Sequence, residues 1–128
     1  MRLLLDTHLL LWAAGPLARL SAQARRLIED PDNELLFSAA SLWEIAIKSA
    51  LRRPNFRVDA RQLRQRLLNN GYQELAVTGE HAVAVADLPP LHKDPFDRML
   101  VAQSIVEGIT LLTSDPRVAQ YSAPVRRV

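Results

Sequence analysis

The chain has 128 residues, of which 48% are hydrophobic and 23% are charged, a composition typical of one globular domain with its own core. Its net charge is +2 and it has no cysteine, which excludes disulfides, thiolate metal ligands and thiol nucleophiles. No apolar run approaches the roughly 20 residues of a membrane span, and the N-terminus lacks the long apolar stretch of a signal peptide. We therefore expect a single domain over residues 1–128 that works in the cytoplasm and not at a membrane.

Short apolar runs alternate with helical patterns in the first half of the chain. In chain order the pattern predicts a strand over 3–5, a helix over 9–13, a helix over 21–30, a strand over 34–38, a helix opening at Ser41 and a helix over 59–71. Glu44 follows Ser41 by three residues, which is the spacing of a capping box. Asp59 and Gly71 are suitable residues for the start and the end of the last of these helices.

The second half continues the alternation. It predicts a strand over 74–77, a helix from 78 to just before Pro89, a helix over 94–108, a strand over 109–113 and an edge strand over 125–128. The helix signal after Asp94 is strong, because Asp94 is a suitable N-cap, Pro95 suits the first helical position and Gly108 suits the end. Strands that alternate with helices indicate an α/β fold with a parallel sheet covered on both faces.

Four acidic residues stand where a predicted buried element meets a turn: Asp6, Glu44, Asp97 and Asp115. Each has an ordinary structural explanation as a cap, a turn residue or half of an ion pair, so none carries a functional prediction alone. Ligands of open α/β sheets bind beyond the carboxyl ends of the strands, which is where Asp6 and Asp115 fall. Carboxylates that meet there repel each other, and a hard cation such as Mg²⁺ or Mn²⁺ is their natural partner.

Several polar neighbours are auxiliary candidates for the same site. Thr7, Thr113 and Ser114 lie beside Asp6 and Asp115, where their hydroxyl groups either hold a carboxylate or a phosphate oxygen or only satisfy turn backbone. Asp94 is expected to be a helix cap that touches the site. The three histidines lack the spacing of a zinc site and are interpreted as ordinary structural or surface residues.

The segment from residue 48 to 66 holds seven basic residues and one acid, a local net charge of +6. Such a block indicates either a polyanion site or a solvated helix face, and the sequence leaves both open. Lys48, Arg52 and Arg53 are its candidate contacts to a polyanion such as RNA. Glycine-rich phosphate loops and a serine-hydrolase elbow are absent from the sequence.

Three segments in this order carry a family resemblance: residues 6–12 (DTHLLLW), 41–48 (SLWEIAIK) and 92–103 (HKDPFDRMLVAQ). They resemble PIN-domain ribonucleases, and within these the VapC-type toxins of bacterial toxin–antitoxin modules. The resemblance extends from residue 1 to about residue 121. It implies a three-layer α/β/α sandwich with a central, mainly parallel sheet.

The resemblance also implies roles for particular residues. Asp6, Glu44 and Asp97 match the first three acids of an Mg²⁺ or Mn²⁺ site, and Asp115 matches the more variable fourth. Asp94 is not one of the usual four. His8 stands where many PIN domains carry Asn or Ser, which is a departure from the family pattern.

The implied activity is metal-dependent endoribonuclease cleavage, in which a metal-activated water attacks an RNA phosphodiester. The implied partners are an RNA substrate, a cognate antitoxin protein and a second copy of the chain. Trp12 and Trp43 are candidates for a dimer surface, although tryptophan is more often part of the core.

Two other classes of function remain as alternatives. An Asp-dependent phosphatase or phosphoacceptor would use Asp6, but its chemistry requires a second acid two residues later, and position 8 is histidine. A non-catalytic RNA-binding or regulatory module would keep the acids as caps. Aromatic residues are only 5% of the chain and do not interleave with the basic segment, so stacking platforms for RNA bases have little support.

Overall fold

The computed structural model describes residues 1–51 and 58–128. Its centre is a parallel sheet with the strand order β3-β2-β1-β4-β5. The strands are β1 (Arg2–Leu5), β2 (Glu34–Ser38), β3 (Gln73–Leu75), β4 (Thr110–Thr113) and β5 (Val125–Arg127). The order has its crossing point at β1, because the chain builds outward from β1 through β2 to β3 and then returns to the other side of β1.

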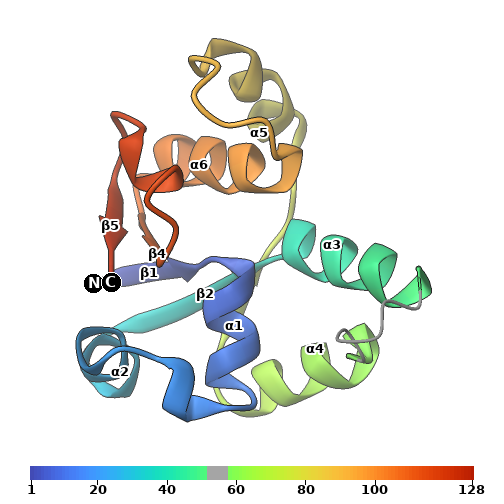
Figure 1. Cartoon of the computed structure of the whole chain (residues 1–128), viewed down its shortest axis with the longest axis vertical. Coiled ribbons are helices and arrows are strands. Elements are labelled where there is room, and N and C mark those ends of the chain that lie inside the picture. Colours follow the sequence, from blue (N-terminus) through green and yellow to red (C-terminus); the bar gives the residue numbers. More distant parts are fainter. Residues whose placement is uncertain (52–57) are drawn as a thin grey trace.

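Helices cover both faces of this sheet (Figure 1). The described helices are α1 (Thr7–Ala13), α2 (Ala22–Glu29), α3 (Ala39–Ala50), α4 (Ala60–Asn69), α5 (Gly79–Ala84) and α6 (Pro95–Glu107), with short 3-10 turns at Leu17–Arg19, Val85–Asp87 and Val118–Gln120. Helices α1, α2 and α4 lie on one side of the strands, and α5 and α6 lie on the other. No helix of the described residues is long and apolar enough to cross a membrane.

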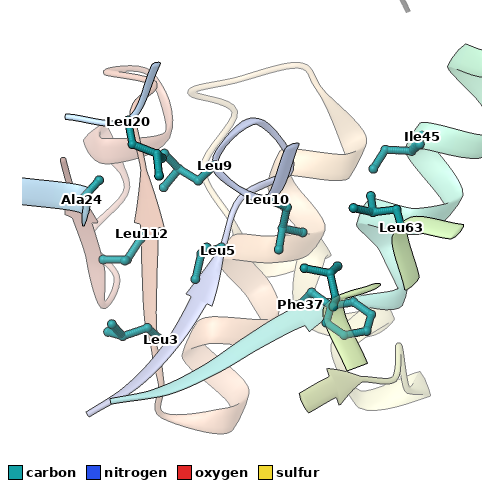
Figure 2. Close-up of a cluster of buried hydrophobic side chains, with 11 residues drawn as sticks. Leu3, Leu5, Leu9, Leu10, Leu20, Ala24, Phe37, Ile45, Leu63 and Leu112 are labelled. Carbon is teal, nitrogen blue, oxygen red and sulfur yellow. The ribbon is translucent and has the colours of Figure 1, made fainter. Parts of the chain in front are cut away.

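Alternation along β1 divides the core into two clusters. Leu3 and Leu5 face one way, and the cluster around them (Figure 2) includes Leu10 of α1 and Leu63 of α4. Leu4 faces the other way and packs with residues of β2, β4 and α6. Side chains in a strand alternate between faces, so three consecutive leucines supply both cores. Full burial of one leucine stabilises the fold by about 2 kcal/mol.

Helix caps show where local sequence signals hold. The predictions for Asp59 and Asp94 are confirmed, since Asp59 accepts a hydrogen bond from Arg61 N–H and Asp94 accepts one from Phe96 N–H. Gly108 follows α6 with a φ of 65°, a left-handed conformation that costs glycine little. The prediction for Ser41 is wrong.

Helix α3 begins three residues before the predicted position. Its N-cap is Ser38, the last residue of β2, whose Oγ accepts a hydrogen bond from Ala40 N–H at 3.0 Å. Ser41 therefore lies inside the helix, and Glu44 is not a capping-box partner. The sequence signal was ambiguous because both serines precede an apolar run, and only the pairing of β2 with β3, in which Ser38 lies opposite Leu75, shows where the strand ends.

Three other predictions need smaller corrections. Helix α1 starts at Thr7 and not at residue 9, and β3 spans Gln73–Leu75 and not 74–77. Trp43 is not a core residue, because 64% of its surface is exposed. Trp12 is partly buried and packs against the cluster around Leu3 and Leu5.

Candidate active site

The first carboxylate of the site is held by two neighbouring strands. Because β1 and β4 are parallel and adjacent, Asp6 and Thr113 meet at the same edge of the sheet. Thr113 Oγ1 donates a hydrogen bond to Asp6 Oδ2 at 2.6 Å, and Leu9 N–H donates to Asp6 Oδ1 at 2.9 Å. The Thr113 hydroxyl also accepts a hydrogen bond from the N–H of Asp115 at 3.0 Å. Asp6 thus caps α1 and stands at the junction of both strands.

The second carboxylate comes from α3, which follows the carboxyl end of β2. Glu44 is buried, and Thr7 Oγ1 donates a hydrogen bond to its Oε1 at 2.8 Å. The same Thr7 hydroxyl lies 3.0 Å from Ser41 Oγ. On its other oxygen, Glu44 forms an ion pair with Lys48 Nζ at 2.6 Å. Glu44 is therefore connected to the neighbour of Asp6, and its charge is balanced by a lysine one turn later.

A histidine and two aspartates lie together at the start of α6. Asp94 caps the helix with Oδ1, which accepts hydrogen bonds from the N–H groups of Phe96 and Asp97 at 2.8 and 3.0 Å. His92 Nε2 lies 2.8 Å from Asp97 Oδ2. Across residues 1–51 and 58–128, His92, Asp94 and Asp97 are the one group of three acidic or histidine residues whose ligand atoms all lie within 4.8 Å of one another.

The pKa values connect this group to Asp6. The pKa of Asp97 is raised from 3.8 to about 6, mainly by burial, while the hydrogen bond with His92 opposes the shift and the nearby charges of Asp94 and Asp6 contribute to it. Burial also raises the pKa of Asp6, against the hydrogen bonds from Thr113 and from backbone N–H groups. Asp6 and Asp97 therefore share one electrostatic environment, in which negative charge is costly.

Asp115 occupies the rim of this environment. Burial on its own would raise the pKa of Asp115, but hydrogen bonds and charge from Arg117 hold it below its usual range, with a smaller contribution from the charge of His92. Arg117 Nη2 lies 3.3 Å from Asp115 Oδ2. Asp115 thus stands close to the site but pairs with an exposed arginine.

Of the residues predicted from the sequence, Asp6 and Asp115 are joined by hydrogen bonds through the Thr113 hydroxyl, Thr7 is joined to Glu44, and Asp94 and Asp97 lie together at the start of α6. Within residues 1–51 and 58–128, the group of close ligand atoms contains Asp97 but not Asp6, Glu44 or Asp115. The backbone N–H of Ser114 also faces Asp6. Sequence interpretation missed His92. The available signal was its position in the same short segment as Asp94 and Asp97, two residues before the helix cap.

The predicted ligands Asp6, Glu44, Asp97 and Asp115 fit a hard divalent cation. They offer carboxylate oxygens, which Mg²⁺ and Mn²⁺ prefer. Asp6 is buried and Asp97 is largely buried, and both have raised pKa values. The fold therefore holds two carboxylates where nearby positive charge does not compensate for their burial. His92 is not counted among these ligands, because its Nε2 contacts Asp97 Oδ2 at 2.8 Å.

Comparison with known proteins decides the family. Residues 3–124 match the family model described as the PIN domain. The chain belongs to the PIN-domain family. This PIN domain is 30% identical over 122 residues to Ribonuclease VapC22 of Mycobacterium tuberculosis, a match that covers 94% of the chain and 92% of the relative.

Solved structures with the same fold are more distant in sequence. VapBC2 from Rickettsia felis, bound to a DNA fragment from its promoter, has a TM-score of 0.73 at 13% identity and covers 100% of this chain and 99% of its own. VapBC-1 from nontypeable Haemophilus influenzae has a TM-score of 0.64 at 17% identity and covers 99% and 98%. These likenesses concern the fold, and they confirm the predicted α/β architecture with its parallel sheet.

The basic segment is only partly described in this PIN domain. Lys48 pairs with Glu44, Arg64 pairs with Glu74 at 2.6 Å, and Arg66 donates a hydrogen bond to the carbonyl oxygen of Ala14 at 2.8 Å. These three residues therefore have intramolecular partners. Two of the predicted RNA contacts, Arg52 and Arg53, lie outside the described residues.

Proposed function

We propose that this PIN-domain protein is a divalent-cation-dependent endoribonuclease that hydrolyses RNA phosphodiesters. The observation that carries the proposal is the shared environment of Asp6 and Asp97 at the carboxyl edge of the sheet, where the pKa of Asp97 is raised to about 6. The similarity to a protein named Ribonuclease VapC22 supports RNA as the substrate. We also propose that this activity takes place in the cytoplasm, where RNA is available as a substrate.

We assign the binding of Mg²⁺ or Mn²⁺ to Asp6, Asp97, Glu44 and Asp115. A cation bound there supplies Lewis-acid chemistry: it promotes deprotonation of a water molecule and offsets negative charge on the phosphate oxygens. The chain's own groups orient the carboxylates. Thr113 and Leu9 N–H fix the two oxygens of Asp6, and Thr7 fixes Glu44.

Lys48 has two roles in this proposal. In the absence of a cation it balances the buried charge of Glu44, to which it is bound at 2.6 Å. With Glu44 among the cation ligands, the partly exposed ammonium group of Lys48 would be available to bind an RNA phosphate. Contacts of this kind weaken as salt concentration rises. We assign the same phosphate-binding role to Arg52 and Arg53 on the basis of their position in the sequence.

The biological role we infer is that of the toxin in a toxin–antitoxin pair that also forms homodimers. Support comes from solved relatives, since the structures from Rickettsia felis and Klebsiella pneumoniae are a VapBC assembly and a toxin–antitoxin complex. The exposed face of α3 is a candidate for such contacts. It carries Trp43, Ile47 and, just after the helix, Leu51 as exposed apolar side chains.

The test is a comparison of two conservative aspartate variants. Asp6 and Asp59 are both N-caps whose carboxylates accept backbone hydrogen bonds, but only Asp6 belongs to the site. Asn preserves a cap. We expect Asp6→Asn to abolish Mg²⁺- or Mn²⁺-dependent RNA cleavage and Asp59→Asn to leave it unchanged.

The measurement is sequencing of RNA ends after incubation of RNA with each purified protein, with and without a chelator. Discrete new ends that need the cation and the wild-type Asp6 support the proposal and reveal the target. Cleavage that persists in the Asp6→Asn protein contradicts it. Binding of RNA without new ends would instead favour the non-catalytic module.

A further inference from the structure

The segment between α5 and α6 is held by an arginine of α6. Arg98 Nη1 donates a hydrogen bond to the carbonyl oxygen of Pro89 at 2.9 Å. Its Nη2 donates to the carbonyl oxygens of Val85 and Leu88 at 3.2 and 3.4 Å. Arg98 forms no ion pair with an acid of residues 1–51 or 58–128. The planar guanidinium group of Arg98 therefore uses its N–H donors to bind carbonyl oxygens of this segment.

A buried tyrosine from a distant part of the chain joins the same loop. Tyr121, which follows the 3-10 turn at Val118–Gln120, is only 4% exposed. Its hydroxyl oxygen accepts hydrogen bonds from Arg98 Nη1 and from the backbone N–H of His92, both at 3.1 Å. The hydroxyl also lies 3.5 Å from the carbonyl oxygen of His92. One phenol thus contacts both backbone polar groups of His92.

These contacts converge on the residue that touches Asp97. The His92 side chain is only 7% exposed, and its Nε2 lies 2.8 Å from Asp97 Oδ2. Asp97 and Arg98 are neighbours on α6, so the contacts form a closed ring: Asp97 to His92, His92 to Tyr121, and Tyr121 to Arg98. If these contacts only fixed the loop backbone, they would not need to include His92, the residue that contacts Asp97.

We infer that Arg98 and Tyr121 are positioning residues that hold His92 so that its imidazole fixes the orientation of the Asp97 carboxylate. This inference rests on the proposed function, because it concerns the same cation site. With Oδ2 occupied by His92 Nε2–H, Oδ1 is the oxygen of Asp97 left for a cation. Partners that orient a ligating carboxylate in this way typically contribute 10- to 100-fold to metal affinity or activity.

The test uses Tyr121→Phe, which removes only the hydroxyl, and Tyr72→Phe as the matched control. Tyr72 is also largely buried, but it belongs to the segment before β3 and its hydroxyl forms no hydrogen bond with a residue of the described part of the chain. We expect Tyr121→Phe to weaken Mn²⁺ binding, measured by calorimetry, by about 10-fold, and Tyr72→Phe to leave it unchanged. Arg98→Lys is expected to behave like Tyr121→Phe.

A double-mutant cycle separates positioning from a general loss of structure. If Tyr121 acts through His92, then Tyr121→Phe has no further effect on Mn²⁺ affinity once His92→Ala is present. A loss of the same size in both backgrounds would overturn the inference.

Nuclear magnetic resonance of the imidazole nitrogens tests the positioning without a cation. We expect one Nε2–H tautomer of His92 in the wild type and in Tyr72→Phe, and a mixture of tautomers in Tyr121→Phe and Arg98→Lys. An unchanged His92 signal in Tyr121→Phe would overturn the inference. If the wild type neither binds Mn²⁺ nor cleaves RNA, the proposed function fails, and the His92 signal still decides the positioning of the imidazole.

Discussion

A carboxylate kept in a buried, negatively charged environment destabilises the fold that holds it unless a cation is bound. Asp97 shows this effect in its pKa, which burial raises from 3.8 to about 6, and its side chain is only 21% exposed. A raised acid pKa means that the folded state binds the proton more tightly than the unfolded state. The stabilisation from that proton is complete below about pH 4 and is lost as pH rises through about 6.

Asp97→Asn should therefore stabilise the cation-free protein near pH 7.5 and change its stability little near pH 4. A shift of about two pKa units corresponds to about 3 kcal/mol in the free energy of unfolding. Urea unfolding in a chelator, repeated across this pH range, measures the difference. Parallel pH profiles for the wild type and the variant would contradict the assignment of the shift to Asp97.

At the same scale, sequence interpretation succeeded where a residue's position follows from local signals. The place of Asp6 directly after β1 and the cap role of Asp94 could be predicted, because an apolar run precedes Asp6 and a helical pattern with Pro95 follows Asp94. For His92 the sequence showed only its closeness to Asp94 and Asp97, because its contacts with Tyr121 form only after the chain has folded, and Tyr121 in turn contacts Arg98. The ion pair between Asp115 and Arg117 was also missed, although the two residues are close in sequence.

Elements differ in how far local signals determine their ends. Helix α6 was predicted within one residue at both ends, because its cap, its proline and its terminal glycine are local signals. Strand β3 was predicted too late and too long, because its end is determined by pairing with β2, which local patterns do not report. The start of α3 was misplaced for the same reason.

The corrected cap of α3 leads to a prediction at this scale. Ser38 Oγ accepts the hydrogen bond from Ala40 N–H, so Ser38→Ala should lower the free energy of unfolding by about 1 kcal/mol. Ser41→Ala should cost less, about 0.5 kcal/mol, because Thr7 retains its hydrogen bond to Glu44. Chemical denaturation of both variants measures the difference. A larger loss for Ser41→Ala would place the cap where the sequence pattern suggested.

For the whole molecule, the alternation of strands and helices was enough to predict a parallel sheet with helices on both faces. It was not enough to predict the order β3-β2-β1-β4-β5, since strand order depends on contacts between distant segments. The family resemblance implied a three-layer sandwich with a mainly parallel sheet but no strand order, and the match of residues 3–124 to the PIN domain confirms the family. The placement of Asp6 and Thr113 side by side follows from that order.

Cation binding should appear as a change in the stability of the whole molecule. At Mn²⁺ or Mg²⁺ concentrations about 100-fold above the dissociation constant, linkage predicts about 2.7 kcal/mol of stabilisation, or a rise in Tm of about 10 °C. Differential scanning fluorimetry with and without a chelator measures this. The rise should disappear in Asp6→Asn and persist in Asp59→Asn. Equal rises in all three proteins would mean that the cation binds elsewhere.

The bond between Asp6 and Thr113 joins positions 107 residues apart. During synthesis on the ribosome, Asp6 is made first, and the hydroxyl that orients it is made near the end. Under the proposed function, a nascent polypeptide that still lacks its last quarter therefore has no assembled site with which to cleave RNA. The proposed cleavage activity would then begin only when translation is nearly complete.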